Sequence, residues 1–177
     1  INHHLDDGLN IIGISGRIDS DDSARFERIA NSITGPTLVI LNSPGGAMVD
    51  GLIIGERIRS GGFITGVPAN TVCASTCGLM WLAGTARYVS GTSHIGFHAA
   101  FPGNGDNVKE TGVGNALIGA YLTRLGLSYR AISYVTSSAP DQMTWMHKAD
   151  AQRIGIEVVT IAAPTSKASS APPTVLP

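Results

Sequence analysis

The feature that most constrains the fold is an uninterrupted apolar run early in the chain. Residues 37–41 read TLVIL, with turn-forming or polar residues on both sides. A strand without alternation of polar and apolar residues is typical of the centre of a parallel sheet, where both faces are covered. We therefore predict an α/β fold with a mostly parallel sheet.

Strand-like and helix-like segments alternate along the rest of the chain, which favours the same fold class. Residues 102–114 are glycine-rich and polar and are predicted to form a loop, and residues 164–177 form a tail rich in Ala, Ser and Pro. The domain prediction is one catalytic domain over residues 1–163, followed by this tail. Strands are predicted over 9–18, 37–41, 63–67, 87–90, 95–97 and 156–162, and helices over 19–33, 47–60, 76–83, 115–125, 128–137 and 143–154, the last a helix or a turn and a helix.

The composition narrows the classes of function. Only 14% of the 177 residues are charged, against about 25% in an average soluble domain, so we expect much surface to be covered in a homo-oligomer or by a partner. The 12 basic and 13 acidic residues leave a net charge of −1, which gives no footprint for nucleic acid. No run approaches 18 apolar residues, so we expect no transmembrane segment in this chain.

Ser75 is the first candidate catalytic residue. It stands before the predicted helix that starts at Thr76, where free backbone N–H groups favour developing negative charge. The Thr76 N–H is thus a natural donor to an oxyanion. The alternative is that Ser75 simply caps the helix, a common role for serine.

Two further segments complete a plausible acyl-transfer site. Gly45 and Gly46 follow the buried strand, and their backbone can approach a substrate closely, although any strand-to-helix turn can use a diglycine. His98 ends a short strand, and imidazole is the usual general base near neutral pH. The alternative for His98 is a structural role. His94 competes with it but is predicted to lie on a surface turn.

Cys73 and Cys77 flank Ser75. No further Cys and His spacing supports a zinc site, so we predict no metal. The two cysteines are either buried thiols or a local disulfide that stiffens the serine turn in an oxidising compartment.

These motifs together resemble the proteolytic subunit of the Clp protease, within the Clp-protease and crotonase superfamily. The similarity runs over residues 9–158, most of the chain, with three motifs in the family's order. It implies a spiral of β-β-α units with a mostly parallel sheet. The matching positions are the segment LNSPGG at 41–46, Gly16, Ser75 with Gly84, Arg87-Tyr88 through Ser93 to His98, and Asp150-Ala151 with Gly155-Ile156.

The resemblance implies a serine peptidase without a cofactor. Ser75 is then the nucleophile and His98 its base, and the Gly46 and Thr76 amides form the oxyanion hole. Gly45 and Gly46 also line a groove in which a peptide pairs as an added strand.

The third member of the triad departs from the family pattern. The position expected to hold the family's aspartate is Met143, which cannot orient an imidazole. The nearest carboxylate is Asp141, our candidate for the orienting residue, although it can equally cap a helix after Pro140. Thr144 is a second candidate, and a dyad completed by water or a backbone carbonyl is a third.

Two departures bear on partners and location. The chain begins close to the first family strand, without the segment that resembles an axial gate, so we expect no ATPase partner. That feature and the paired cysteines favour a periplasmic or otherwise extracytoplasmic relative that cuts peptides or unfolded segments.

Three other functions stay open. A related branch uses a lysine base, and Lys109 is the one lysine near the site in sequence. A crotonase-like acyl-CoA enzyme needs carboxylates in the site, and none of the four glutamates occupies a motif position. A catalytically decayed binding or scaffold protein is favoured by Met143.

Overall fold

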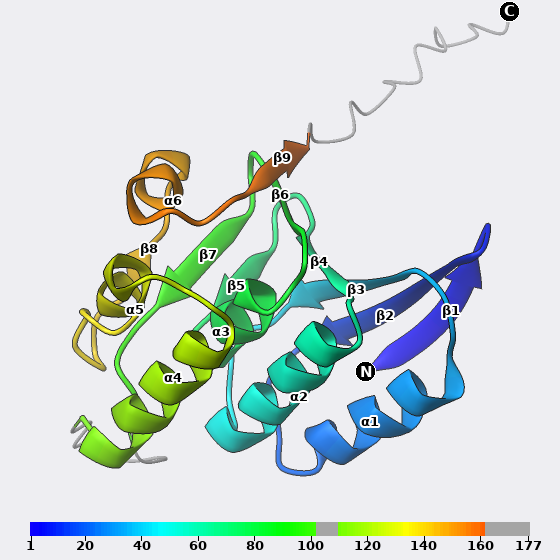
Figure 1. Ribbon diagram of the computed structural model, residues 1–177, viewed down its shortest axis with the longest axis horizontal. Helices are drawn as coiled ribbons and strands as arrows, with labels where there is room; N and C mark the ends of the chain where they lie inside the picture. The colour runs from blue at the N-terminus through cyan, green and yellow to red at the C-terminus, as the bar shows by residue number, and fades with distance from the viewer. Residues whose placement is uncertain (102–109, 162–177) are drawn as a thin grey trace, which may run out of the picture.

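The computed structural model describes residues 1–101 and 110–161. Over these residues the chain forms two sheets with helices packed around them (Figure 1). The main sheet has the strand order β1-β2-β3-β4-β6-β9, and the smaller one the order β5-β7-β8. The strands are β1 Asn2–Asp6, β2 Leu9–Ser15, β3 Thr37–Asn42, β4 Ile64–Val67, β5 Val72–Ala74, β6 Arg87–Ser90, β7 His94–Phe97, β8 Thr144–Trp145 and β9 Val159–Ile161.

The sheets are mostly parallel, as predicted. From β2 to β9 every neighbouring pair in the main sheet is parallel, and so are β5 and β7, whereas β1 and β8 pair antiparallel with their neighbours. Helices α1 and α2 lie side by side along one face of the main sheet (Figure 1). The helices are α1 Asp22–Ser32, α2 Met48–Ser60, α3 Thr76–Leu82, α4 Gly112–Arg124, α5 Tyr129–Val135 and α6 Lys148–Ile154.

Several local predictions need correction. The antiparallel strand β1 was not predicted, because all five of its residues are exposed and carry no apolar pattern. Helix α4 begins at Gly112, inside the predicted loop, since Thr111 caps it by accepting a hydrogen bond from the Gly114 N–H. The predicted helical stretch 143–154 starts with strand β8 instead. Residues 102–109 of the predicted loop, Ala162 and the predicted tail 164–177 lie outside the described residues.

The apolar run in β3 is central, but only one of its faces is fully covered. Val39 and Leu41 are completely buried beneath the helices, whereas Leu38 and Ile40 point the other way and are half-buried. A hollow of about 340 Å³ lies along this second face. We name it the open sheet face, and it is lined by Leu9, Leu38, Ile40, Ile64, Gly66, Val67, Pro68, Tyr88 and Ile161.

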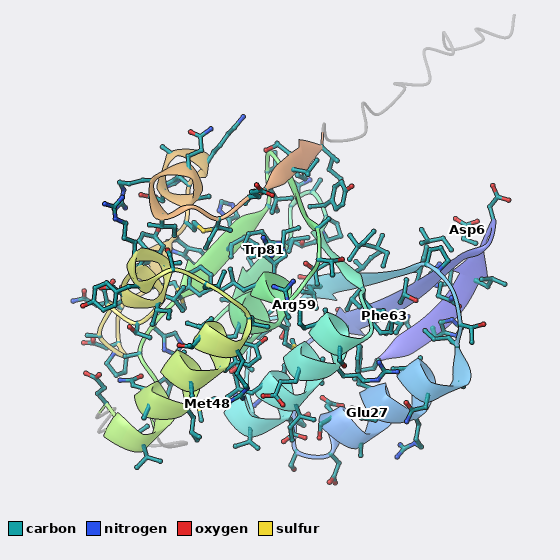
Figure 2. All side chains as sticks on the ribbon, in the orientation of Figure 1. Asp6, Glu27, Met48, Arg59, Phe63 and Trp81 are labelled. Carbon is teal, nitrogen blue, oxygen red and sulfur yellow. A yellow bond between two sulfur atoms is a disulfide. The ribbon has the colours of Figure 1, made fainter. Side chains whose placement is uncertain are left out.

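Helix α3 is the centre of the core, and all seven of its residues are buried. Trp81, labelled near the middle of Figure 2, is fully buried, and its backbone carbonyl accepts a hydrogen bond of 2.8 Å from Thr65 Oγ1. Beyond the end of the helix, Arg87 donates to the carbonyl oxygens of Leu82 and Gly84. Burial lowers the pKa of Arg87, so these contacts offset the cost of placing its charge there. The helix that follows Ser75 is therefore held at its C-terminal end.

Replacement of Gly55 by alanine tests how tightly helix α2 packs. A Cβ at Gly55 would collide with the hydroxyl of the buried Tyr121, which donates a hydrogen bond to the Leu79 carbonyl. We expect Gly55→Ala to lower the free energy of unfolding by about 1–3 kcal/mol in urea titrations. Gly119→Ala is the matched control, because nothing lies within 4 Å of its added Cβ on α4. Equal stability of the two variants would contradict this packing.

Candidate active site

Ser75 occupies a sharp turn between β5 and α3. Its backbone angles, φ 56° and ψ −125°, are unusual for a residue other than glycine and cost about 1–3 kcal/mol. The Ser75 N–H donates to the Gly96 carbonyl at 2.8 Å, which ties the turn to β7. Its side chain makes no capping hydrogen bond to the helix, so the alternative role as a side-chain cap is not observed.

The Gly45-Gly46 segment lies directly against this turn. Gly45 has φ 98°, and a Cβ on it would sit 2.8 Å from the Ser75 Cβ and 3.1 Å from the Thr76 nitrogen. Thr76 Oγ1 donates to the Gly46 carbonyl at 3.1 Å. Only a residue without a side chain fits at Gly45, so this approach explains the glycine.

The backbone amide of Gly46 faces the site rather than the sheet. On either side of it, the Gly45 carbonyl accepts from the Ile18 N–H and the Ala47 N–H donates to the Ile18 carbonyl. The Gly45 carbonyl and the Gly46 N–H belong to one trans peptide group and point in opposite directions, so the Gly46 N–H points away from Ile18. Within the described residues, neither this N–H nor that of Thr76 has a hydrogen-bond acceptor. In the part of the chain that the structure describes, both N–H groups are therefore available as hydrogen-bond donors.

His98 follows the next parallel strand of the small sheet. β5 and β7 are parallel, with Ala74 opposite Gly96, so the C-terminal ends of the two strands lie side by side. The His98 Nδ1 lies 2.8 Å from the Ala99 carbonyl oxygen. A carbonyl can only accept, so in this contact Nδ1 is the donor, and Nε2 is the ring nitrogen that this contact leaves unused. The ring also packs on Phe101, with centroids 5.3 Å apart.

A cavity of about 300 Å³ joins these elements. Ser75, Thr76, Gly45, Gly46 and His98 all line it, so the structure brings together five of the six predicted site residues. Among the described residues, Ser75 and His98 make no hydrogen bond to each other, which is common in sites without substrate. The rest of the described lining is Arg17, Pro44, Met48, Leu79, Phe97, Ala100, Phe101, Ile118 and Val135.

Asp141 is the predicted residue that lies elsewhere. It is exposed, and it is absent from the described lining of the cavity. Met143 packs near Gly96 instead, and Thr144 Oγ1 hydrogen-bonds to Ser138 Oγ. The Ser138 carbonyl in turn accepts from the Ala99 N–H at 2.8 Å. In the described part of the chain, the group that orients His98 is thus the Ala99 carbonyl, which no side-chain motif could have revealed.

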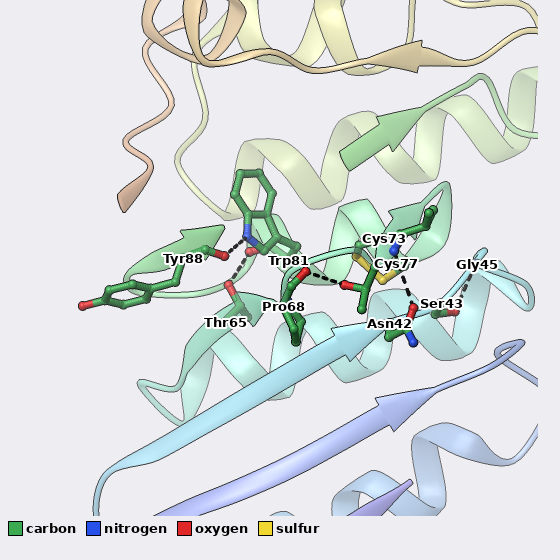
Figure 3. Close-up of a disulfide and its surroundings, with 11 residues drawn as sticks. Asn42, Ser43, Gly45, Thr65, Pro68, Cys73, Cys77, Trp81 and Tyr88 are labelled. Atoms are coloured by element: carbon green, nitrogen blue, oxygen red, sulfur yellow. Dashed lines mark hydrogen bonds between the residues drawn. A yellow bond between two sulfur atoms is a disulfide. The ribbon is translucent and has the colours of Figure 1, made fainter. Parts of the chain in front are cut away.

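A disulfide joins Cys73 and Cys77 across the serine turn (Figure 3). The two Cα atoms are 5.0 Å apart, and both side chains are fully buried. The bond connects the end of β5 to the first turn of α3, the two elements that Ser75 separates. It therefore limits how far the turn can relax.

Neighbouring contacts hold the strand that carries this disulfide. The Ser43 N–H donates to the Val72 carbonyl, and the Ala74 N–H donates to the Ser43 carbonyl, at 2.8 and 3.0 Å. Ser43 Oγ accepts from the Gly45 N–H, as Figure 3 shows. Ser43 thus links β5 to the diglycine segment.

The residues that the structure describes contain no group of three His, Cys, Asp or Glu side chains suited to a metal ion. None of their helices is long and apolar enough to cross a membrane.

Comparison with known proteins identifies the fold. No family model matches the chain, and no curated protein matches it. Two similar solved structures are mutants of the membrane-bound stomatin-specific protease 1510-N, one serine-to-alanine and one lysine-to-alanine, the latter in complex with a substrate peptide. Both are 18% identical over 88% of this chain; they are covered over 79% and 75% of their own length, with TM-scores of 0.64 and 0.66. This similarity shows the fold alone and agrees with the predicted α/β architecture with a mostly parallel sheet.

Reduction of the disulfide tests its contribution to the serine turn. For so short a loop, chain entropy predicts that reduction lowers the free energy of unfolding by about 2 kcal/mol. Urea titrations with and without a thiol reductant measure this difference. A Cys73→Ala/Cys77→Ala variant is the control, because the chain has only 2 cysteines and its stability should not respond to reductant. Identical midpoints for the oxidised and reduced wild type would refute the role.

Proposed function

We propose that this protein is a serine peptidase that hydrolyses peptide bonds with Ser75 as nucleophile and His98 as base. One observation carries the proposal. Ser75, in a strained turn at a helix start, shares one cavity with an imidazole and with two backbone amides that have no acceptor among the described residues. Strained turns of this kind cluster at active sites, and the combination supplies each group that acyl transfer requires.

In the proposed reaction, His98 Nε2 removes the proton from Ser75 Oγ as the oxygen attacks the scissile carbonyl carbon. The Gly46 and Thr76 N–H groups stabilise the resulting oxyanion. The tetrahedral intermediate collapses, the C–N bond breaks, and the imidazolium returns its proton to the leaving amine. A water molecule, deprotonated by His98, then releases the acyl group and regenerates Ser75. No step needs a cofactor.

The Ala99 carbonyl supports His98 in this proposal by holding its Nδ1–H. A neutral carbonyl stabilises the imidazolium less than a carboxylate does, so we expect a slower enzyme than one with a full triad. Asp141 is the carboxylate candidate for the same role, acting from its exposed position.

A lysine base is the second candidate mechanism. The similar protease 1510-N was solved both as a serine mutant and as a lysine mutant, and the lysine mutant holds a substrate peptide. In this chain the candidate is Lys109, which lies outside the described residues. Substitution of each base candidate separates the two mechanisms.

Labelling with a fluorophosphonate probe, followed by intact mass, tests the proposal. We expect stoichiometric labelling of the wild type and none of Ser75→Ala. His98→Ala should slow labelling by at least about 100-fold, the usual contribution of a general base. Asp141→Asn and Lys109→Ala should each change the labelling rate by less than about twofold. Slow labelling of Asp141→Asn would instead indicate a carboxylate triad, and slow labelling of Lys109→Ala a lysine base.

Matched control variants show whether the loss of labelling is specific to the proposed catalytic residues. Ser137→Ala removes an exposed serine and His94→Ala an exposed histidine, and both should label like the wild type. An unlabelled wild type with an intact circular dichroism spectrum, under oxidising and reducing conditions, would refute the hydrolase. The decayed binding or scaffold protein would then be favoured, and binding of coenzyme A would instead indicate a crotonase-like enzyme.

The open sheet face is the surface through which we propose that the protein forms a homo-oligomer. Its apolar lining and the low charge of the chain support a homo-oligomer in which a second copy covers it. The proposed enzyme acts on peptides or unfolded segments without an ATPase partner. The disulfide supports an oxidising, extracytoplasmic location.

Analytical ultracentrifugation tests the assembly. We expect the wild type to sediment as a dimer or larger species. Ile161→Glu should shift it toward the monomer by placing a charge on the open sheet face, where Ile161 is 46% exposed. Val113→Glu, a similar change at a 74% exposed position on α4, should leave the assembly intact. A monomeric wild type would refute the proposal.

A further inference from the structure

Arg17 stands at the candidate active site without a role in the proposed chemistry. Among the described residues that line the cavity, it is the one side chain with a permanent charge. Most of the others are apolar, including Met48, Leu79 and Phe97, and none of the described lining residues is acidic. The cavity therefore presents a single cation beside an apolar wall.

The backbone around Arg17 is fixed against the oxyanion segment. On one side of it, the Gly16 N–H donates to the Asn42 carbonyl at 3.0 Å. On the other side, the Ile18 N–H donates to the Gly45 carbonyl at 2.9 Å, and the Ile18 side chain is buried. The backbone of Arg17 is thus held next to Ile18, which bridges to Gly46, while the Arg17 side chain is 65% exposed.

The existing partner of Arg17 is a weak one. Its Nε lies 3.8 Å from a carboxylate oxygen of Asp19, and the two side chains are 65% and 71% exposed. Ion pairs this exposed contribute little, because solvent screens them and both side chains lose freedom. A carboxylate on a bound ligand can displace Asp19 and gain a bidentate contact with the planar guanidinium.

We propose that Arg17 selects substrates that carry a carboxylate close to the scissile bond. The inference rests on the proposed peptidase function, since a peptide laid along Gly45 and Gly46 passes within reach of this side chain. A carboxylate in a peptide comes either from an Asp or Glu side chain or from a free C-terminus. Either source meets the guanidinium while neighbouring apolar side chains of the substrate occupy the cavity.

Binding to the inactive Ser75→Ala variant tests the selection apart from catalysis. The probes are peptides of Ala and Leu with a neutral fluorophore, read by fluorescence anisotropy. One carries a glutamate near its centre and an amidated C-terminus, one a glutamine and a free C-terminus, and the reference a glutamine and an amidated C-terminus. We expect at least one carboxylate peptide to bind about fivefold more tightly than the reference, a preference that falls with added salt.

Further substitutions of Arg17 in the same variant assign the preference to this residue. With Arg17→Gln the preference should fall to about one, and with Arg17→Glu the reference peptide should bind better than the carboxylate peptides. Arg28→Gln, which removes an exposed arginine from α1, is the matched control and should retain the preference. The peptide that shows the preference identifies the source of the carboxylate.

The outcomes separate this inference from the proposed function. Equal binding of all three peptides, or a preference that survives Arg17→Gln, overturns the role of Arg17 even when the wild type reacts with the fluorophosphonate. A preference that depends on Arg17 in a protein that never labels supports the carboxylate site and refutes only the peptidase.

Discussion

The close approach of Gly45 to the Ser75 turn is the constraint on which the rest of the site depends. A Cβ at Gly45 would meet the backbone of Ala74 and Thr76 as well as the side chain of Ser75. Without that Cβ, the diglycine segment brings the Gly46 amide to the same cavity as the amide of Thr76. Two strand-to-helix turns, thirty residues apart in sequence, thus line one cavity.

The strain at Ser75 is sustained by its surroundings. An unfavourable backbone conformation persists only where neighbouring contacts over-determine it. Here the disulfide joins the elements on both sides of Ser75, the Ser75 N–H is bound to Gly96, and the whole of α3 is buried. The core thus positions the serine as well as stabilising the fold.

Backbone groups supply much of the proposed chemistry. In the proposal, the oxyanion donors are the amides of Gly46 and Thr76, and the carbonyl of Ala99, which accepts from His98, orients the ring. Backbone groups depend on local conformation rather than on residue type, so the proposed chemistry does not require an aspartate at the position of Met143. The side chains that vary around it, such as Arg17, are then available to determine which substrates bind.

The sequence by itself determined the fold class and most of the site. The apolar run of β3 predicted the α/β fold class, and local motifs together with the family resemblance that they carry predicted five residues that line one cavity. Strand β1 and the half-open face of β3 were missed, since each depends on which neighbours the tertiary structure supplies. Only the tertiary structure showed that Asp141 lies outside the described cavity lining and that Ala99 and Arg17 belong to the site. A backbone carbonyl has no sequence signature, and an exposed arginine can be recognised as part of a site only when folding places it beside Gly45.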